Sequence, residues 1–419
     1  MEEVKVEQVG YKSLINERNY LLETLSSIIS RFGDGIDTIA FSLLVYQITG
    51  STLLVATLFA VNGLPNLIFG MISGVLCKYI TDKKIMAICD FGRGICVSLI
   101  AILFITGNLA TWHLYVITFL NSSFESFRGP AATSIIPKLL PMEKIEYGTA
   151  FSSAGTKVTE LIGLAAAPFL IGMFGLGSAI IIDAITFIIC GLLILGIRLE
   201  EALSTDDKLT VKSYFIDLKE GFRYVKKDGL ILNIIIFAAV INALFTPYNA
   251  LQAPYVEDVL HTGSSAMSVM SIAILLGMTV STVFAPKIKE KIGGRNMFVI
   301  GGVMFGITYF SLAFFGNLTP AGIYISLAVA SFIGGVGILL VNFPLQVILL
   351  KNVPQEYLPR AAAIMMAGTL CAAPIGSCIT GVVSQFISIE MIYLVVGVIT
   401  SILFLLQYFN NNIKKFNED

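Results

Sequence analysis

The sequence predicts an all-α membrane protein with twelve transmembrane helices arranged in two six-helix bundles. Hydrophobic residues make up 56% of the 419 residues and charged residues only 13%, about half the roughly 25% that is typical of soluble domains. The mean hydropathy is +0.85. Long apolar runs and an alternating placement of basic residues complete the pattern. A chain this poor in charge cannot cover a soluble fold of this size with polar surface.

Each apolar run is long enough to cross a bilayer, which takes about 20 residues of helix. Glycine and proline inside the runs do not argue against helices, because neighbouring helices can satisfy the freed backbone groups. The runs cover residues 20–47, 51–77, 85–106, 112–136, 147–173 and 175–197, then 229–256, 264–286, 296–316, 320–349, 360–386 and 390–410. We therefore expect six helices, a break and six more.

The break between the two sets of runs is polar and defines the domain organisation. Its sequence KLTVKSYFIDLKEGFRYVKKDG suits amphipathic helices on the membrane face, or a plain surface linker. The predicted parts are an N-terminal segment 1–18, a bundle 19–197, a linker 198–228, a bundle 229–411 and a tail 412–419.

Lysine and arginine concentrate in alternate connections, including the linker and the C-terminal tail. The connections in between (TGST, GNLAT, FGLG and GNLTPAG among them) contain neither residue. By the positive-inside rule, both termini and the linker are predicted to be cytoplasmic. The sequence thus predicts a multi-pass protein of the cell membrane with no cleavable signal, since residues 1–19 are polar and charged.

The sequence lacks the residue patterns that several classes of function require. The net charge of −1 gives no basis for a nucleic-acid partner. Two histidines and six scattered cysteines offer no metal-ligand spacing, and a G-x4-G-K-[ST] phosphate loop is absent. We therefore expect no cofactor, no bound metal and no enzymatic activity.

The two halves repeat some of their pattern. Pro141 and Glu143 at the start of one long run correspond to Pro354 and Glu356, at an offset of 213 residues. Repeated bundles joined by a cytoplasmic linker are typical of transporters whose halves rock around a central site.

Three stretches, FGDGIDTIAFSLLVYQITGST, FRGPAATSIIPKLLPMEKI and NFPLQVILLKNVPQEYLPRAAA, resemble the major facilitator superfamily. The likeness is to its macrolide-efflux-like branch of drug and siderophore exporters, and it covers essentially the whole chain. It implies the major facilitator fold and a secondary transporter.

The fifth run resembles the antiporter motif of this superfamily, G-x8-G-x3-GP-x2-GG, which implies export by antiport. The corresponding residues are Ala154, Gly163, Ala167, Pro168 and Gly172, with Ile171 in place of one glycine. The alternative is an ordinary seam of small residues that lets two helices approach closely.

The connection between the second and third runs resembles a second superfamily motif in degenerate form. Gly74 matches, whereas Lys78 stands where an aspartate is usual, and Asp90 and Arg93 resemble the Asp-x-x-Arg of the branch. The resemblance implies a gate on the cytoplasmic side.

The stretch SRFGDGIDTIA places charges within the first run. Asp34 lies about 15 residues past Asn19, or roughly 22 Å along a helix. A charge at that depth costs about 2.5–3.5 kcal/mol on insertion scales, so it is usually paired, hydrated or functional. The polar residues of this run recur every three or four positions and form one stripe: Glu23, Ser27, Arg31, Asp34, Thr38 and Ser42.

We hypothesise that Asp34 carries a proton and that Arg31, one turn away, tunes it. Glu125 is a second candidate for the proton carrier. The resemblance places it where the superfamily's motif in the fourth helix normally has an arginine, and Arg128, one turn further on, could supply that positive charge instead. Lys157 and Glu160 complete the predicted coupling set. The alternative is a structural network pairing Arg31, Arg128 and Lys157 with Asp34, Glu125 and Glu160.

The predicted substrate pocket is apolar with a few polar groups, as is usual for drug-sized ligands. Its expected residues are Phe41, Tyr46, Phe124, Phe245, Tyr248, Asn249, Asn342 and Gln346. The predicted function is export of an amphipathic, macrolide-like small molecule by proton antiport, with substrate, protons and membrane lipids as partners of a monomer. A siderophore, peptide or lysolipid exporter, a lipid flippase, a channel and an uptake symporter are the alternatives.

Overall fold

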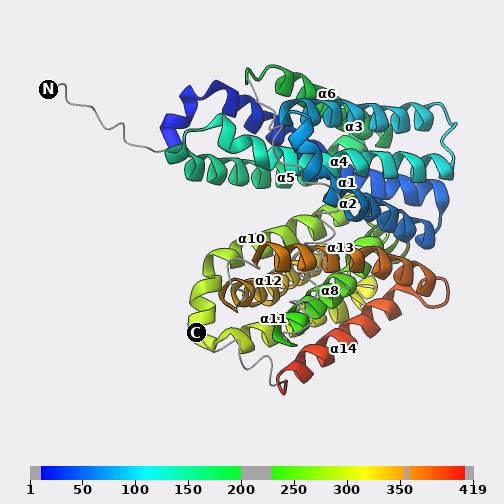
Figure 1. Ribbon diagram of the computed structural model, residues 1–419. Helices are drawn as coiled ribbons and strands as arrows, with labels where there is room; N and C mark the ends of the chain where they lie inside the picture. Colours follow the sequence, from blue (N-terminus) through cyan, green and yellow to red (C-terminus); the bar gives the residue numbers. More distant parts are fainter. Residues whose placement is uncertain (1–10, 200–228, 353–357, 411–419) are drawn as a thin grey trace. The chain divides into compact units, whose positions relative to one another are not determined.

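The computed structural model describes residues 11–199, 229–352 and 358–410 (Figure 1). Helices form nearly all of this part of the chain, and no strand occurs in it. The predicted linker from residue 200 onward, the outermost residues 1–10 and 411–419, and Pro354 and Glu356 of the repeat lie outside the described residues. Within the described ranges, twelve helices of 19 or more residues coincide with the twelve apolar runs, which confirms the all-α fold class.

In the first half the long helices are α1 Arg18–Thr49, α2 Thr52–Tyr79, α3 Asp82–Ile105, α4 Thr111–Leu139, α5 Ile145–Phe174 and α6 Leu176–Leu195. In the second half they are α8 Gly229–Ala250, α10 Ser264–Ile292, α11 Gly294–Leu312, α12 Pro320–Asn352, α13 Leu358–Val383 and α14 Ile389–Gln407. The short pieces are η1 Tyr11–Asn16, η2 Met142–Lys144, α9 Gln252–Pro254, η3 Tyr255–Val259 and η4 Phe315–Asn317.

Eight helical segments among the described residues are long and apolar enough to cross a membrane by composition alone. Neither α1 nor α4 is among them. Both helices carry the charged and polar side chains that the sequence singles out, and these side chains interrupt their apolar surface. Because such groups within a membrane helix are usually functional, α1 and α4 are the first place to look for a site.

Sharp turns between helices use glycines with positive φ. Gly175 (φ +80) separates α5 from α6, and Gly293 (φ +81) separates α10 from α11. Only glycine adopts this left-handed region without a steric penalty. The adjacent helices can therefore follow one another after a single non-helical residue.

The chain divides into two compact units. Unit 1 comprises Met1–Phe41 and Ile68–Thr210, and unit 2 comprises Ser42–Leu67 and Val211–Asp419. In unit 1, α3 packs against α4 and α6 around a core that includes Met86, Ile135 and Ile194. In unit 2, α12 packs against α10 and α11, α11 packs against α14, and α8 packs against α13.

This division differs from the predicted bundles 19–197 and 229–411 at residues 42–67. The difference has a packing reason within unit 2. A Cβ atom on Gly381 of α13 would lie 2.9 Å from the side chain of Ala56, and one on Gly63 would lie 3.1 Å from Pro374. Close helix approach at small residues therefore joins this part of α2 to α13.

Within unit 1, the glycines that flank Asp34 bring α1 against two neighbouring helices. A Cβ atom on Gly33 would lie 2.3 Å from Asp183 Oδ1 of α6. One on Gly35 would lie 2.7 Å from the backbone oxygen of Glu160 on α5, and one on Gly163 would lie 2.4 Å from the backbone oxygen of Phe32. The backbones of α1 and α5 thus touch directly beside Asp34.

The residues of the antiporter-like motif divide between this seam and the outside of α5. Gly163 and Ala167 are buried, whereas Ala154 and Gly172 are exposed and Pro168 is half-buried inside the helix. The small-residue seam that the sequence offers as an alternative is present at Gly163. The antiport function that the motif implies stays a prediction.

We expect Gly163→Val to destabilise the protein strongly, because its side chain would overlap a backbone carbonyl that cannot move aside. Overpacking of this kind costs about 1–3 kcal/mol or more. Gly172→Val is the matched control in the same helix, since no atom lies within 4 Å of the added Cβ. Thermal unfolding of the two purified variants in detergent measures the difference, and equal melting temperatures would contradict the close contact.

Candidate functional site

Asp34 of α1 accepts bonds from two arginines through its two carboxylate oxygens. Arg93 Nη2 of α3 lies 2.9 Å from Asp34 Oδ1, and Arg31 Nη1 lies 3.1 Å from Oδ2. The Asp34 side chain is 18% exposed, Arg93 is 6% exposed and Arg31 is 49% exposed. Asp34 is therefore held between one buried and one exposed cation, and the pairing with Arg31 that the sequence predicts is present.

Arg93 is the central cation of the site. Besides Asp34, the carboxyls of Glu125 on α4 and Asp183 on α6 lie within its electrostatic range. The Phe187 ring packs on the guanidinium, with its centroid 4.0 Å from Cζ. Arg93 Nε has no hydrogen-bond partner within the described part of the chain. Three helices, α1, α4 and α6, thus direct charges or an aromatic ring at this one group of α3.

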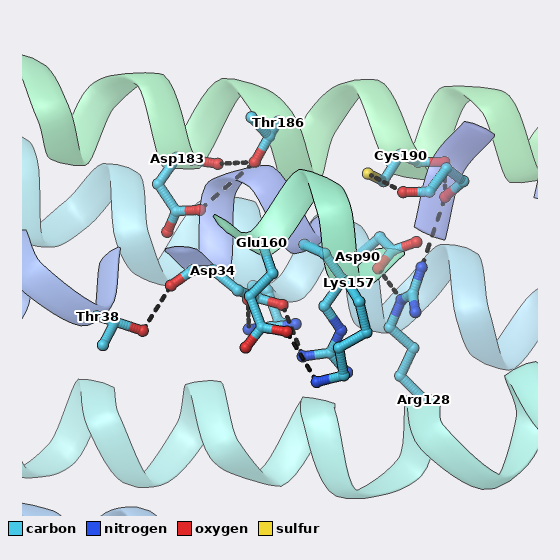
Figure 2. Close-up of polar contacts among 12 residues, drawn as sticks. Asp34, Thr38, Asp90, Arg128, Lys157, Glu160, Asp183, Thr186 and Cys190 are labelled. Atoms are coloured by element: carbon cyan, nitrogen blue, oxygen red, sulfur yellow. Dashed lines mark hydrogen bonds and ion pairs between the residues drawn. The ribbon is translucent and has the colours of Figure 1, made fainter. Parts of the chain in front are cut away.

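Asp183 and Asp37 add two carboxyls that sequence reasoning does not place in the coupling set. Asp183 is fully buried, and Thr186 Oγ1 donates to its backbone oxygen at 2.7 Å and lies 3.4 Å from Oδ1 (Figure 2). No hydrogen bond reaches Asp183 Oδ2 from any described residue. Asp37 interacts electrostatically with Asp34, Arg93 and Glu125.

We call these groups the Asp34 cluster; its members are Asp34, Asp37, Glu125, Asp183, Arg31 and Arg93. Four carboxyls face two guanidinium groups. With every group ionised, the carboxylates would outnumber the guanidinium groups by two. Asp183 is fully buried and has no ion pair among the described residues, whereas Asp34, Asp37 and Glu125 are partly exposed. Because a buried charge without a close partner is costly, a bound proton or cation would stabilise Asp183 most.

A second set of buried polar groups lies around Arg128 of α4, and we call it the Arg128 cluster. Arg128 Nε forms an ion pair with Asp90 Oδ1 of α3, and its Nη2 lies 3.5 Å from Ser26 Oγ of α1. The Cys190 thiol on α6 donates to the backbone oxygen of Ser26 at 3.1 Å (Figure 2). The cluster therefore joins four helices of unit 1.

Glu23 completes the Arg128 cluster and is 2% exposed. Ser27 Oγ donates to Glu23 Oε1 at 2.7 Å, whereas Oε2 has no partner among the described residues. Its electrostatic neighbours are Arg128 and Asp90. Two carboxyls thus share one guanidinium, which repeats the excess of negative charge found around Asp34.

One sequence-based pairing needs correction here: Arg128 pairs with Asp90, whereas the structural alternative pairs it with Glu125. Asp90 and Arg93 are both buried on α3 and bind α4 and α1. The reason is that positions three apart on a helix share a face, and this face of α3 points into unit 1. The cytoplasmic gate that the resemblance implies for them stays a prediction.

The rest of the predicted gate, Gly74 and Lys78, belongs to a part of α2 whose side chains the structure does not describe. At the start of α3, Asp82 instead accepts a bond from Lys138 Nζ of α4 at 2.7 Å and one from the Ser134 hydroxyl.

Lys157 and Glu160 pair with each other inside α5. Their charged atoms are 2.9 Å apart, and their side chains are 56% and 28% exposed. No ion pair among the described residues links them to Asp34. The structure therefore agrees with the pairing of these two residues while placing them outside the buried cluster.

The predicted substrate residues are distributed over both units. In unit 1, the Phe124 ring packs on Gly92 of α3, and Phe41 is half-buried. In unit 2, the remaining side chains include Tyr46, Phe245, Tyr248, Asn249 and Asn342; Gln346 lies outside the described side chains.

Tyr248 belongs to the packing of unit 2. It is 1% exposed, and its hydroxyl donates to Ser331 Oγ at 2.9 Å. Phe245 stacks on Tyr248 with ring centroids 5.8 Å apart. Buried and fully bonded, Tyr248 supports the position of Phe245 rather than facing a ligand itself.

The polar residues of the predicted pocket have different surroundings. Asn342 donates its amide to the backbone oxygen of Ile338 at 2.9 Å, whereas Asn249 is exposed. Tyr46 donates its hydroxyl to Asp258 Oδ2. Of these groups, the exposed Asn249 amide is the most available for a ligand.

Comparison with known proteins shows the same architecture elsewhere. At a TM-score of 0.76 and 14% identity, the fold matches the solved nucleoside transporter NupG over 95% of this chain and 98% of that one. A bacterial homologue of the iron transporter ferroportin in an inward-facing state matches with a TM-score of 0.72 and 14% identity, over 94% and 99% of the two chains. At these identities the likeness shows the fold alone.

Similar sequences include proteins named for transport and efflux. The uncharacterised major-facilitator-type transporter YfiS of Bacillus subtilis is 24% identical over 398 residues, which are 91% of this chain and 90% of YfiS. Macrolide efflux protein A of Streptococcus pyogenes is 21% identical over 88% of this chain and 90% of its own. The multidrug efflux pump Tap of Mycolicibacterium fortuitum is 20% identical over 90% and 94%.

Twelve long helices in the described ranges, charged side chains buried among them and a match to a family model of major-facilitator type define a multi-pass membrane transporter of the major facilitator superfamily. Within that superfamily, the chain belongs to the transmembrane secretion effector family, whose model matches residues 19–419.

Proposed function

We propose that this transporter exports an amphipathic small molecule across the cell membrane in exchange for protons. The observation that carries the proposal is the Asp34 cluster, in which four carboxyls share two guanidinium groups. A proton is the smallest ligand that relieves such an excess, and it can enter and leave through the accessible side of Asp34.

Protonation would act on the link between α1 and α3. When Asp34 is ionised, its carboxylate binds the buried Arg93 and the accessible Arg31 together. A neutral carboxyl binds both arginines more weakly, because the Coulomb attraction between a carboxylate and a guanidinium is lost on protonation. A ligand that changes the contact between two helices shifts the balance between two conformations of a bundle.

The proposed coupling set comprises the Asp34 cluster and Arg128 with its buried partners. Lys157 and Glu160 remain in the set as its water-accessible pair, since the α5 backbone at Glu160 touches Gly35. We propose that Phe41, Tyr46, Phe124, Phe245, Asn249, Asn342 and Gln346 contribute to substrate binding and that Tyr248 supports them.

The direction of transport and the substrate class are proposed from the relatives. Proteins with 20–21% identity to this chain are named as macrolide and multidrug efflux proteins, and α5 carries the antiporter-like motif. We propose a macrolide-like drug as substrate, with a siderophore, peptide or lysolipid as alternatives. We also propose that the protein is a monomer without enzymatic activity. Both termini are proposed to be cytoplasmic, because basic residues concentrate in alternate connections.

Transport by inside-out vesicles tests this function. The panel contains a macrolide, ethidium, a ferric siderophore and a fluorescent lysophospholipid, and an external pH dye reports proton movement. We expect at least one compound to accumulate only with an imposed pH gradient, and accumulation to drive protons the other way. Accumulation that is the same with and without the pH gradient, and that a protonophore does not reduce, would contradict proton antiport. Lipid movement between leaflets without a gradient would indicate a flippase.

A further inference from the structure

A cavity of about 700 Å³ lies in unit 1 where the starts of α1 and α3 meet the end of α6. Three of its lining residues are cationic and none is acidic. The lining residues are Arg18, Lys83, Leu195, Gly196, Ile197, Arg198 and Leu199. We call this cavity the basic pocket. It is separate from both buried charge clusters, none of whose members line it.

The basic pocket is held in shape by bonds between its walls. Asn19 Nδ2 donates to the backbone oxygen of Arg198 at 2.8 Å, and the backbone N–H of Arg198 donates to Asn19 Oδ1 at 3.0 Å. Lys83 Nζ donates to the backbone oxygen of Ile197 at 2.7 Å. These three bonds tie the segment after α6 to α1 and α3, so the pocket exists before a ligand binds.

The two arginines of the pocket are available to a ligand. Arg18 and Arg198 are exposed, and neither guanidinium has an ion-pair partner in the described part of the chain. Guanidinium groups bind phosphate in a bidentate fork, and an ammonium group adds a point charge. The C-terminal end of α6 carries partial negative charge, which disfavours a nearby anion. Lys83 donates to the Ile197 carbonyl there and so offsets part of that charge. A phosphate group fits this set of donors.

An apolar surface leads along α6 to the pocket. Its residues recur at spacings of three and four and are 38–58% exposed: Ile181, Ile185, Ile188, Leu192 and Leu195. The last of them also lines the pocket. A ligand with an anionic head and an apolar chain would match both features at once, whereas a free anion would use only the first.

We propose that the basic pocket binds the phosphate of an anionic phospholipid, whose acyl chain lies along α6. Basic pockets between membrane helices on the cytoplasmic side are suited to such headgroups. This lipid would fasten the ends of α1, α3 and α6 to one another and to one leaflet. The inference shares the proposed orientation of the helix ends but uses no feature of the proposed proton exchange, so either can fail alone.

Lipid binding to the purified full chain in detergent tests the proposal. Phosphatidylglycerol, phosphatidylcholine and inorganic phosphate are titrated separately, and binding is measured by native mass spectrometry and by the shift in melting temperature. The test variant is Arg18→Gln/Arg198→Gln, which leaves Lys83 and its structural bond in place. Lys12→Gln/Lys84→Gln is the control, because it removes two exposed cations near the same helix ends but outside the pocket.

We expect phosphatidylglycerol to bind the wild type and the control with the same affinity. The apparent Kd of the test variant should rise about 10–100-fold, because the loss of one charge-assisted bond raises Kd by about a factor of ten. Arg198→Lys should lie in between. Equal affinity in wild type and test variant, or equal affinity for phosphatidylcholine, would overturn the proposal. Displacement of the lipid by millimolar inorganic phosphate would overturn the lipid assignment in favour of a free anion. Monodisperse elution and an unshifted lipid-free melting temperature establish that the variants are folded.

Discussion

Replacement of Asp34 by Asn is expected to reduce transport driven by a pH gradient strongly while leaving the protein folded. The amide keeps the size of the side chain and still accepts a bond from Arg93, but it cannot exchange a proton. If the coupling free energy between proton and substrate is about 1–3 kcal/mol, gradient-driven accumulation falls about 5–150-fold. Inside-out vesicles with an imposed gradient measure the loss directly.

Downhill counterflow of the same compound separates coupling from binding in this variant. It should persist in Asp34→Asn, because exchange across equal pH needs no proton movement. Glu143→Gln serves as the control, since it neutralises an exposed carboxyl of unit 1 outside both clusters. Full gradient-driven accumulation by Asp34→Asn would remove this carboxyl from the mechanism.

Arg93→Met is expected to have the largest effect on stability. The Arg93 side chain is 6% exposed, and Arg93 is the only buried cation of the Asp34 cluster among the described residues. Removing one partner of a buried ion pair costs about 3–5 kcal/mol, because the other charge is left buried and uncompensated. A marked fall in melting temperature should follow, and Asp34→Asn in the same chain should restore part of it.

Arg31→Met offers the matched comparison, since Arg31 binds the other oxygen of the same carboxylate but is 49% exposed. Exposed pairs contribute about 0.2–1 kcal/mol, so this variant should melt close to the wild type. Equal losses in the two arginine variants, or no restoration by Asp34→Asn, would show that burial does not set the strength of the Arg93 pair.

The sequence predicts the helices well because the length of an apolar run is a local property. Every predicted run coincides with a helix, including those that contain Pro65, Pro168 and Pro374. The pair of Arg31 and Asp34 is local as well, since the two residues lie three apart on one helix. The Lys157–Glu160 pair follows the same rule.

Pairs between helices depend on which faces meet, and spacing in the sequence does not decide that. Arg93 and Asp34 are 59 residues apart, and the resemblance to a superfamily motif predicts a gate role for Arg93 without predicting this pair. One signal was available: Arg93 stands deep in an apolar run, where an arginine needs a buried acid. Asp183, inside the strongly apolar α6, carries the same signal.

The glycines beside Asp34 show why its neighbours could not be read from the sequence. Gly33 and Gly35 are two residues apart, yet one packs on α6 and the other on α5. A run of small residues predicts close packing without naming the partner. The grouping of residues 42–67 with unit 2 likewise follows from contacts of Gly63 and Gly381 with distant parts of the chain.

Proton release on substrate binding tests the central claim most directly. Purified transporter in weakly buffered detergent solution receives a saturating amount of the panel compound that is transported, and a pH dye counts the protons released. The charge excess around Asp34 predicts release from the wild type and none from Asp34→Asn under the same conditions. Unchanged release from Asp34→Asn, or none from the wild type at any pH at which it transports, would contradict it.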